Sequence, residues 1–283
     1  MLLHKDALFL LAIKLSLPDL LNFSSSSKRI NEIICKRDEV WFHKLKEFPK
    51  WNQFKIRSPK EAYIVLYNLN ILKQKLKLKV NVYQLYFLKK FNHGYGETVK
   101  LPREIGSLKN LQKLHLGVNR IVELPKEIGN LTNLEDLNLQ NNQIVELPKE
   151  IGNLIKLETL ALSDNKIVKL PKEMGNLTNL KKLYLDKNKI VKLPIEIGDL
   201  INLEVLCLST NEIVELPKEI GKIIKLRFLY LENNQIIDLP KEMNNLSNLK
   251  ALPLNNNPIL KISENLNKLE IFKIDVTKIK ISE

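Results

Sequence analysis

A Leu-Pro pair recurs every 23 residues along the chain, and this constant spacing limits the possible folds more than any other feature. Seven such pairs run without a slip from Leu101 to Leu239. The full unit reads LxxLxLxxNxIxxLPxEIGNLxx, and its asparagine recurs from Asn119 to Asn257 with an isoleucine two positions later. A unit this short cannot bury its own apolar face, so successive copies are expected to stack into one solenoid with a continuous core.

The pattern inside each unit predicts where its residues point. In the LxLxx segment the leucines alternate with variable residues, which is typical of a short strand with one buried face. Strands of successive units are expected to pair in parallel. The recurrent asparagine follows the strand, where its amide would bond backbone groups that are otherwise buried without partners. The LPxEIGxL half returns the chain along the other side, and its glycine permits a turn or a close backbone approach.

These residues resemble the leucine-rich repeat family, of the 23-residue intracellular type also seen in Ras-group signalling scaffolds. The resemblance implies an α/β fold, a leucine-rich repeat solenoid with a curved parallel sheet on its concave face. Regular repeats are expected over residues 108–261. A degenerate first repeat is expected at 85–107, where Phe91 and His93 hold leucine positions and Gly96 holds the asparagine position, and a degenerate cap at 262–283.

Upstream of the array, residues 51–84 are expected to form a helical junction that covers the open end of the solenoid. Ser58, Pro59 and Glu61 form a helix-start signal, with an N-cap, a first-turn proline and a capping-box glutamate. No Gly/Ser-rich or Pro-rich linker separates this segment from its neighbours, which favours a rigid junction.

Residues 3–41, within an all-helical module at 1–50, resemble an F-box. A leading leucine and an acid precede helix-spaced leucines, and a DL pair, a basic pair and a distal Val-Trp follow. The resemblance implies docking on a Skp-type adaptor of a cullin-RING ubiquitin ligase, while the repeats select the protein to be ubiquitinated. The layout of the chain also resembles F-box-like repeat proteins of large DNA viruses. The adaptor-binding residues implied are Leu3, Asp6, Leu8, Leu11, Leu15, Asp19, Leu20, Lys28 and Trp41.

Two alternatives to the ligase-receptor hypothesis stay open. The N-terminal helices could form a generic module that only caps the solenoid of a signalling scaffold. Nucleic-acid binding is suggested by the net charge of +13, but 19 Lys and Arg against 8 Asp and Glu lie in residues 1–100, and the repeats are nearly neutral. The sequence therefore disfavours a nucleic-acid partner, while a basic N-terminal third is compatible with an acidic protein partner.

The sequence predicts no enzyme, cofactor or metal site. The four histidines, His4, His43, His93 and His115, stand apart, and no phosphate-binding glycine motif occurs. The two cysteines, Cys35 and Cys207, are distant in sequence, which favours a reducing, cytoplasmic setting. No apolar stretch approaches the roughly 20 residues that span a bilayer, so no membrane association is expected.

The variable strand positions are expected to form rows on the concave face, where a target protein would bind. In the early repeats these rows are mostly polar, and in the later ones they gather apolar and aromatic residues inside a charged rim, a composition typical of a binding hot spot. The alternative is that aromatic residues occur there only because they pack well along a sheet. The predicted target-binding residues are Lys182, Tyr184, Val205, Cys207, Phe228, Tyr230 and Glu232.

Overall fold

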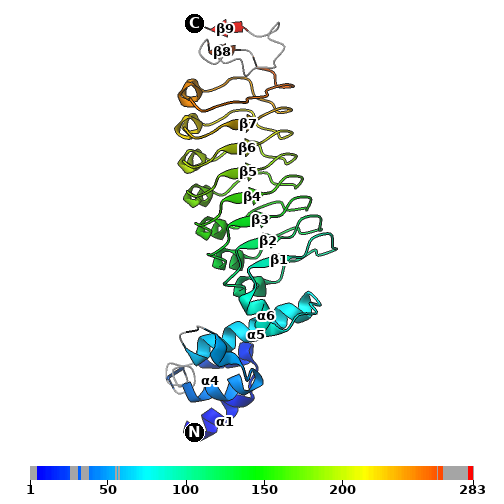
Figure 1. Ribbon diagram of the computed structural model, residues 1–283, viewed down its shortest axis with the longest axis vertical. Coiled ribbons are helices and arrows are strands. Elements are labelled where there is room, and N and C mark those ends of the chain that lie inside the picture. The colour runs from blue at the N-terminus through cyan, green and yellow to red at the C-terminus, as the bar shows by residue number, and fades with distance from the viewer. Residues whose placement is uncertain are drawn as a thin grey trace. The chain divides into compact units, whose positions relative to one another are not determined.

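The computed structural model divides the chain into two compact units, Met1–Phe87 and Leu88–Glu283. Figure 1 colours them from blue to cyan and from cyan to red. The structure describes residues 5–25, 31–32, 38–54, 56, 58–259, 261–263 and 280–282. Each unit has its own core, and each is treated by itself below.

The first unit is helical, as predicted. Its main helix, α5 (Pro59–Lys75), begins after Ser58, whose backbone is extended and whose Oγ accepts a hydrogen bond from the Glu61 N–H at 3.2 Å. The predicted N-cap and first-turn proline are therefore confirmed. Among its described residues, the helices of this unit are α1 (Lys5–Lys14), α2 (Leu17–Ser25), α4 (Asp38–Lys44), α5 (Pro59–Lys75) and α6 (Val82–Phe87), with short 3-10 turns η1 (Leu45–Glu47) and η2 (Trp51–Gln53).

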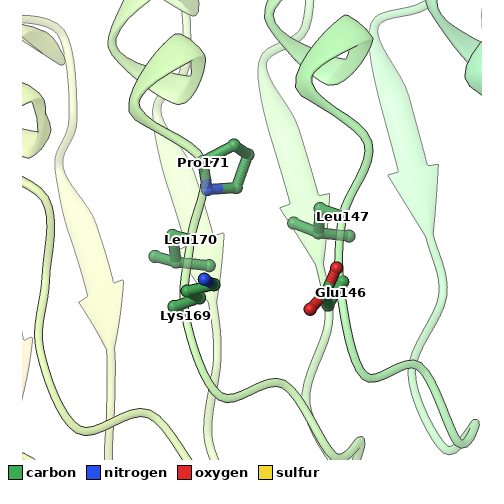
Figure 2. A pocket seen from close by; sticks show the side chains of 5 residues that line it. All are labelled: Glu146, Leu147, Lys169, Leu170 and Pro171. Carbon is green, nitrogen blue, oxygen red and sulfur yellow. The ribbon is translucent and has the colours of Figure 1, made fainter.

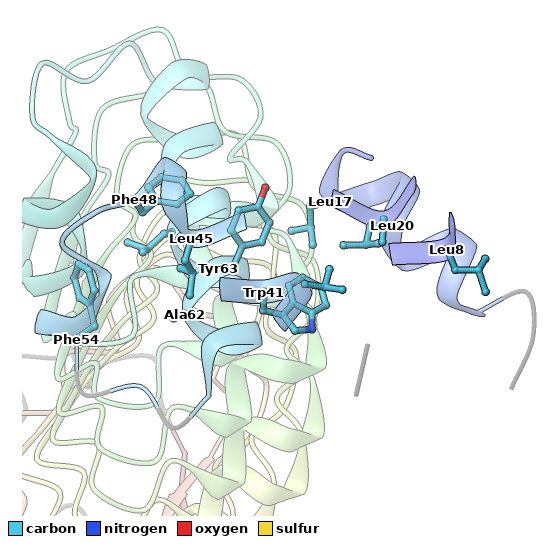
Figure 3. Packing of buried hydrophobic residues seen from close by; sticks show 12 residues of the cluster. Leu8, Leu17, Leu20, Trp41, Leu45, Phe48, Phe54, Ala62 and Tyr63 are labelled. Carbon is cyan, nitrogen blue, oxygen red and sulfur yellow. The ribbon is translucent and has the colours of Figure 1, made fainter. Parts of the chain in front are cut away.

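One hydrophobic core holds this unit together (Figure 3). Trp41 of α4 lies against Tyr63 of α5 with ring centroids 6.1 Å apart, and Leu8 and Leu20 bring α1 and α2 into the same cluster. The core thus draws on residues from both sides of position 50. Lys44 is buried beside it, where its ammonium donates to the carbonyl of Leu15.

The second unit is a stack of repeats with one seven-stranded parallel sheet in the order β1 to β7 (Figure 1). Register follows the 23-residue period, so that Leu137 pairs with Leu160 and Leu160 with Leu183. These leucines are fully buried, which confirms the predicted solenoid and its inward face. The strands are β1 (Lys90–Asn92), β2 (Lys113–His115), β3 (Asp136–Asn138), β4 (Thr159–Ala161), β5 (Lys182–Tyr184), β6 (Val205–Cys207) and β7 (Phe228–Tyr230).

The degenerate first repeat pairs in the predicted register, with Phe91 opposite Leu114. Gly96 stands where later repeats have asparagine, and a Cβ there would approach Asn119 Oδ1 to 2.8 Å. Asn119 instead bonds this repeat itself, because its Nδ2 donates to the His93 carbonyl at 2.9 Å and its Oδ1 accepts from the Thr98 N–H at 3.1 Å. The asparagine ladder therefore starts one repeat later than the sheet.

Each buried asparagine joins two repeats. Asn142 accepts a hydrogen bond from the Ile121 N–H at 3.0 Å, and its Nδ2 donates to the carbonyls of Leu116 and Leu139, both at 3.0 Å. The same bonds recur at Asn165, Asn188, Asn211 and Asn234, and their predicted role is confirmed. The asparagine side chains thus supply hydrogen-bond partners to the backbone groups that are buried after each strand, where no strand pairing satisfies them.

The backbone turns at a position that the sequence analysis did not predict. The residue before each asparagine has a positive φ, from Val118 at 58° to Asn256 at 60°, although none of these residues is glycine. A hydrogen bond to the next repeat holds this left-handed residue, as from the Val118 N–H to the Gln140 carbonyl at 2.9 Å. No glycine has a positive φ. Gly129 instead permits close approach, because a Cβ there would collide with the backbone oxygen of Glu150.

The returning half of each repeat is a 3-10 turn rather than an α-helix. An extended proline precedes each turn, as Pro125 does with φ −68° and ψ 143°, and the Ile128 N–H closes it on the Pro125 carbonyl at 2.9 Å. The turns are η3 (Arg103–Ser107), η4 (Lys126–Asn130), η5 (Lys149–Asn153), η6 (Lys172–Asn176), η7 (Ile195–Asp199), η8 (Lys218–Lys222) and η9 (Lys241–Asn245).

The end of the chain pairs separately from the main sheet. Strands β8 (Lys261–Ser263) and β9 (Lys280–Ser282) form a two-stranded parallel sheet in which Ile262 lies opposite Ile281. Residues 264–279 of the predicted cap at 262–283 lie outside the described residues.

Candidate protein-binding surface

The outward positions of β2 to β7 form a continuous surface, named here the sheet face. Along each strand the central leucine is buried, as Leu183 and Leu206 are, while the residues on either side of it point outward. Parallel register aligns these outward residues in rows at about 4.8 Å spacing. One row brings Tyr184, Cys207 and Tyr230 side by side.

Three aromatic residues gather on β5 to β7 of the sheet face. We name the group Tyr184, Val205, Cys207, Phe228 and Tyr230 the aromatic patch. The rings of Phe228 and Tyr230 are stacked, with centroids 6.5 Å apart and planes 6° from parallel. The structure thus places the five apolar and aromatic members of the predicted target site together, while Cys207 is only 8% exposed and the other four are partly buried.

The thiol of Cys207 is not set up as a nucleophile. Burial raises its pKa to about 12, with smaller contributions from the charges of Asp186 and Glu232. Because the thiolate is the reactive form, the neutral side chain serves as a small apolar group between two tyrosines. Nothing in its surroundings supports covalent chemistry at this position.

One border of the aromatic patch, before the strands begin, is neutralised by ion pairs. Arg227 lies over the Phe228 ring, with Cζ 5.7 Å from the centroid, and its Nη1 is 3.7 Å from Glu204 Oε2. Two repeats earlier, Lys181 Nζ is 3.0 Å from Glu158 Oε2. Arg227 and Lys181 on this border are therefore already paired with carboxylates.

The opposite border, after the strands end, carries two carboxylates held by serines. Asp186 accepts hydrogen bonds from Ser163 Oγ at 3.1 Å and from the Ser209 N–H at 3.2 Å. Ser209 Oγ donates to Glu232 Oε2. Burial raises the pKa of Asp186, the hydrogen bonds from the two serines oppose this rise, and the charge of Glu232 adds to it.

The early repeats differ from the aromatic patch. There the sheet face carries Lys113, Asp136 and Asn138, and His115 Nε2 lies 3.3 Å from Asp136 Oδ2. This region is polar, as the sequence predicts, and offers no aromatic ring. Any surface for apolar recognition on the strands lies in the later repeats.

Comparison with known families decides the classification of this array. The family described as a leucine-rich repeat region matches residues 126–191 and 172–282. The chain belongs to the leucine-rich repeat family. Solenoids of this kind present extended surfaces that bind other proteins.

Three solved leucine-rich repeat structures illustrate the similarity. The ectodomain of the plant membrane receptor kinase GASSHO1/SCHENGEN3 from Arabidopsis thaliana, in complex with CASPARIAN STRIP INTEGRITY FACTOR 2, is 32% identical over 62% of this chain and 22% of its own, with a TM-score of 0.56. An internalin from Listeria monocytogenes is 26% identical over 68% and 52%, with a TM-score of 0.54. The plant peptide hormone receptor RGFR1, in complex with RGF2, is 33% identical over 64% and 33%, with a TM-score of 0.50.

This leucine-rich repeat chain spans between 22% and 52% of the length of those three proteins. No curated protein compared with the chain matches it.

The residues predicted to bind an adaptor fall into two groups in the helical unit. Leu8, Leu20 and Trp41 are buried in its core (Figure 3), where they stabilise the unit itself. Leu11 is exposed and Leu15 is partly buried. Asp19 is exposed and accepts a hydrogen bond from Ser16 Oγ at 2.6 Å. Leu3, Lys28 and the side chain of Asp6 lie outside the described part of the chain.

The helical unit also exposes apolar side chains that the sequence analysis did not single out. Leu10 of α1 is 55% exposed, and Leu21 of α2 and Phe42 of α4 are exposed as well. Phe42 is partly supported by Trp51, with ring centroids 5.7 Å apart. Helical spacing could not reveal Leu10, because apolar residues occur on nearly every side of α1.

A shallow pocket of about 270 Å³ lies away from the strands of the sheet face, between the Leu-Pro segments of two repeats (Figure 2). Its lining residues are Glu146, Leu147, Lys169, Leu170 and Pro171. Beside these segments runs a row of exposed valines in which the Val168 N–H faces the Val145 carbonyl at 3.4 Å. The pocket is small and lies apart from the residues of the aromatic patch.

Other kinds of site are not seen among the residues that the structure describes. Within them, no three His, Cys, Asp or Glu side chains are grouped to hold a metal ion. None of the described helices is long and apolar enough to cross a membrane. The sheet face and the exposed apolar side chains of the helical unit therefore remain as the candidate surfaces.

Proposed function

We propose that this leucine-rich repeat protein is a non-enzymatic adaptor that holds a target protein on its aromatic patch. The observation that carries the proposal is the gathering of Tyr184 of β5 with Phe228 and Tyr230 of β7 on one face of the sheet, inside a polar rim. Large aromatic side chains of this kind dominate binding energy when a partner desolvates them. The complexes of GASSHO1/SCHENGEN3 and RGFR1 with CASPARIAN STRIP INTEGRITY FACTOR 2 and RGF2 support a protein or peptide partner.

The finer part of the proposal is that the helical unit docks on a Skp-type adaptor, which makes the protein a substrate receptor of a cullin-RING ubiquitin ligase in the cytoplasm. The resemblance of residues 3–41 to an F-box supports it. Exposed Leu10, Leu11, Leu21 and Phe42 supply apolar contact area, and the excess of 19 Lys and Arg over 8 Asp and Glu in residues 1–100 suits an acidic partner.

A titration of the full-length chain with a purified Skp-type adaptor tests the docking. We expect saturable binding that Leu11→Asp abolishes, because a charge is placed in an apolar contact. Leu11 is the sharper probe than Leu20, since Leu20 is fully buried and its replacement would unfold the unit. Ile195→Asp, at another exposed apolar position but in the repeats, is the matched control and should bind normally.

Circular dichroism of each variant confirms that it is folded. A folded full-length chain that shows no adaptor binding contradicts the ligase-receptor hypothesis. The protein would then be an interaction scaffold whose N-terminal helices have another role.

Selection of phage-displayed random linear peptides on the full-length chain tests the aromatic patch. We expect the selected peptides to lose most of their affinity for a Tyr184→Ala/Phe228→Ala/Tyr230→Ala variant, since one hot-spot truncation typically costs about 2 kcal/mol or more. A Lys113→Ala/Asp136→Ala/Asn138→Ala variant is the control on the early repeats. Equal affinity for the aromatic variant and the native chain, or greater loss with the control, places the binding surface elsewhere.

A further inference from the structure

The two borders of the aromatic patch differ in charge. On the border before the strands, Glu204 and Glu158 are paired with Arg227 and Lys181. On the border after the strands, the carboxylates of Asp186 and Glu232 are bonded to serines, and neither lies within ion-pair distance of a basic group among the described residues. Two carboxylates without an ion-pair partner therefore lie beside the tyrosine row, at the end opposite Lys182 of β5, while Lys182 and Lys187 are exposed and likewise make no ion pair among the described residues.

The carboxylates of Asp186 and Glu232 lie close enough to the aromatic patch to change the pKa of its residues. Burial raises the pKa of Tyr184, and the neighbouring Cys207 and Asp186 raise it further. Burial is the largest cause of the raised pKa of the Cys207 thiol, and the charges of Asp186 and Glu232 raise that pKa further. Asp186 and Glu232 lie two repeats apart, about 10 Å at the usual strand spacing. They thus flank the tyrosine row at its end.

The border before the strands shows that an aromatic ring beside a carboxylate can hold a basic side chain. Around Phe228, an aromatic ring and the carboxylate of Glu204 together hold the guanidinium of Arg227. Asp186 follows Tyr184 by two residues and Glu232 follows Tyr230 by two, so carboxylates again lie at the end of a row of rings, but neither carboxylate is paired with a guanidinium or ammonium of the described residues. Rings and carboxylates are the two groups that attract a cation at a partly desolvated site.

We infer that the aromatic patch takes a basic peptide segment, in which a Lys or Arg side chain lies between Asp186 and Glu232 and a neighbouring apolar side chain lies on Tyr184 and Tyr230. The inference rests on the proposed function, since it specifies the chemistry of the target at the same surface. The serine hydrogen bonds fix the carboxylates in place before the partner binds, which reduces the entropy lost on binding.

The net charge of the chain makes this inference easy to distinguish from non-specific attraction. A protein with a charge of +13 attracts acidic peptides at long range and repels basic ones. Enrichment of basic residues in a selected peptide pool must therefore arise from local carboxylates. Acidic enrichment is the result expected from net charge alone.

The test uses the pool of phage-displayed random peptides from the selection on the full-length chain that is proposed above. We expect Lys or Arg next to an aromatic or large aliphatic residue to be enriched in the pool. An Asp186→Asn/Glu232→Gln variant should bind these peptides roughly tenfold or more weakly, because charge-assisted hydrogen bonds are lost. Replacing the peptide arginine with citrulline, its neutral isostere, should cause a similar loss.

Glu150→Gln/Glu173→Gln is the matched control, because it removes the same charge from the 3-10 turns η5 and η6 instead of the sheet face. It should leave affinity unchanged. Equal weakening by both pairs of substitutions overturns the inference, since the effect would then be one of net charge. Full binding by the Asp186→Asn/Glu232→Gln variant overturns it as well.

The outcomes also separate this inference from the proposed function. Peptides that depend on Tyr184, Phe228 and Tyr230 but contain no enriched basic residue leave the binding surface standing and refute its basic specificity. A pool in which no peptide depends on the three aromatic residues refutes both.

Discussion

Replacing Asn165 with alanine removes the side chain that joins three backbone groups in the middle of the array. Its Oδ1 accepts from the Ile144 N–H, and its Nδ2 donates to the carbonyls of Leu139 and Leu162, each at 3.0 Å. Asn165 is only 8% exposed, so water does not readily replace these bonds. At about 1 kcal/mol for each lost bond, and more where a buried group stays unsatisfied, Asn165→Ala should cost roughly 3 to 5 kcal/mol of unfolding free energy.

The measurement is urea unfolding followed by far-ultraviolet circular dichroism, which reports the helical unit and the repeats together. Trp41 and Trp51 are the two tryptophans of the sequence, so tryptophan fluorescence reports the helical unit separately. The circular dichroism midpoint should fall. A shift confined to tryptophan fluorescence would contradict the reasoning.

Asn179→Ala is the matched control. Asn179 is exposed and makes one hydrogen bond, from its Nδ2 to the Ile155 carbonyl at 2.7 Å. Its loss should cost about 1 kcal/mol or less. If Asn165→Ala and Asn179→Ala destabilise the array equally, the buried ladder is not what joins the repeats.

Leu160→Ala should destabilise the array by roughly 2 to 5 kcal/mol in the same unfolding assay, because Leu160 is fully buried. Thr159→Ala, at an outward-facing position, should have almost no effect on the free energy of unfolding. Equal effects would show that the inward and outward positions are misassigned. Gly152→Ala should lower the urea midpoint, because the added Cβ would collide with the backbone of Glu173. Ile195→Ala, at an exposed position, should leave the midpoint unchanged. An unchanged midpoint for Gly152→Ala would contradict the close packing of the turns. In a Cys35→Ser chain at about pH 8, iodoacetamide should modify Cys207 far more slowly in the folded protein than in urea. The reason is that burial raises the pKa of the Cys207 thiol to about 12, and the thiolate is the reactive form. Equal rates would show that the thiol is not buried.

The sequence also leaves the surface of the helical unit undecided. Residues 5–14 are apolar on nearly every side of α1, so their spacing does not tell Leu8, which is buried, from Leu10 and Leu11, which are exposed. The predicted adaptor-binding set mixes core and surface residues for this reason. Only packing against α2 and α4 separates them.

The sequence by itself determined the repeat architecture. Seven copies in one unbroken period predict the strand register, the buried leucines and the bonded asparagines, because every repeat meets its neighbour in the same way. Even the degenerate first strand was placed correctly, since Phe91 keeps the period. In a solenoid, the spatial neighbours of a residue are the equivalent residues of the adjacent repeats, so the repeat pattern in the sequence also predicts the tertiary contacts.

Only the tertiary structure decided which exposed charges are compensated. The sequence shows Lys182, Asp186, Arg227 and Glu232 around the aromatic patch but not that Arg227 turns to Glu204 while Asp186 and Glu232 bond serines. It also does not show that Val118 and its counterparts take a left-handed conformation, since none is glycine. Both features depend on side-chain and backbone contacts across repeats, where several partners of similar energy compete and only the packed geometry selects among them.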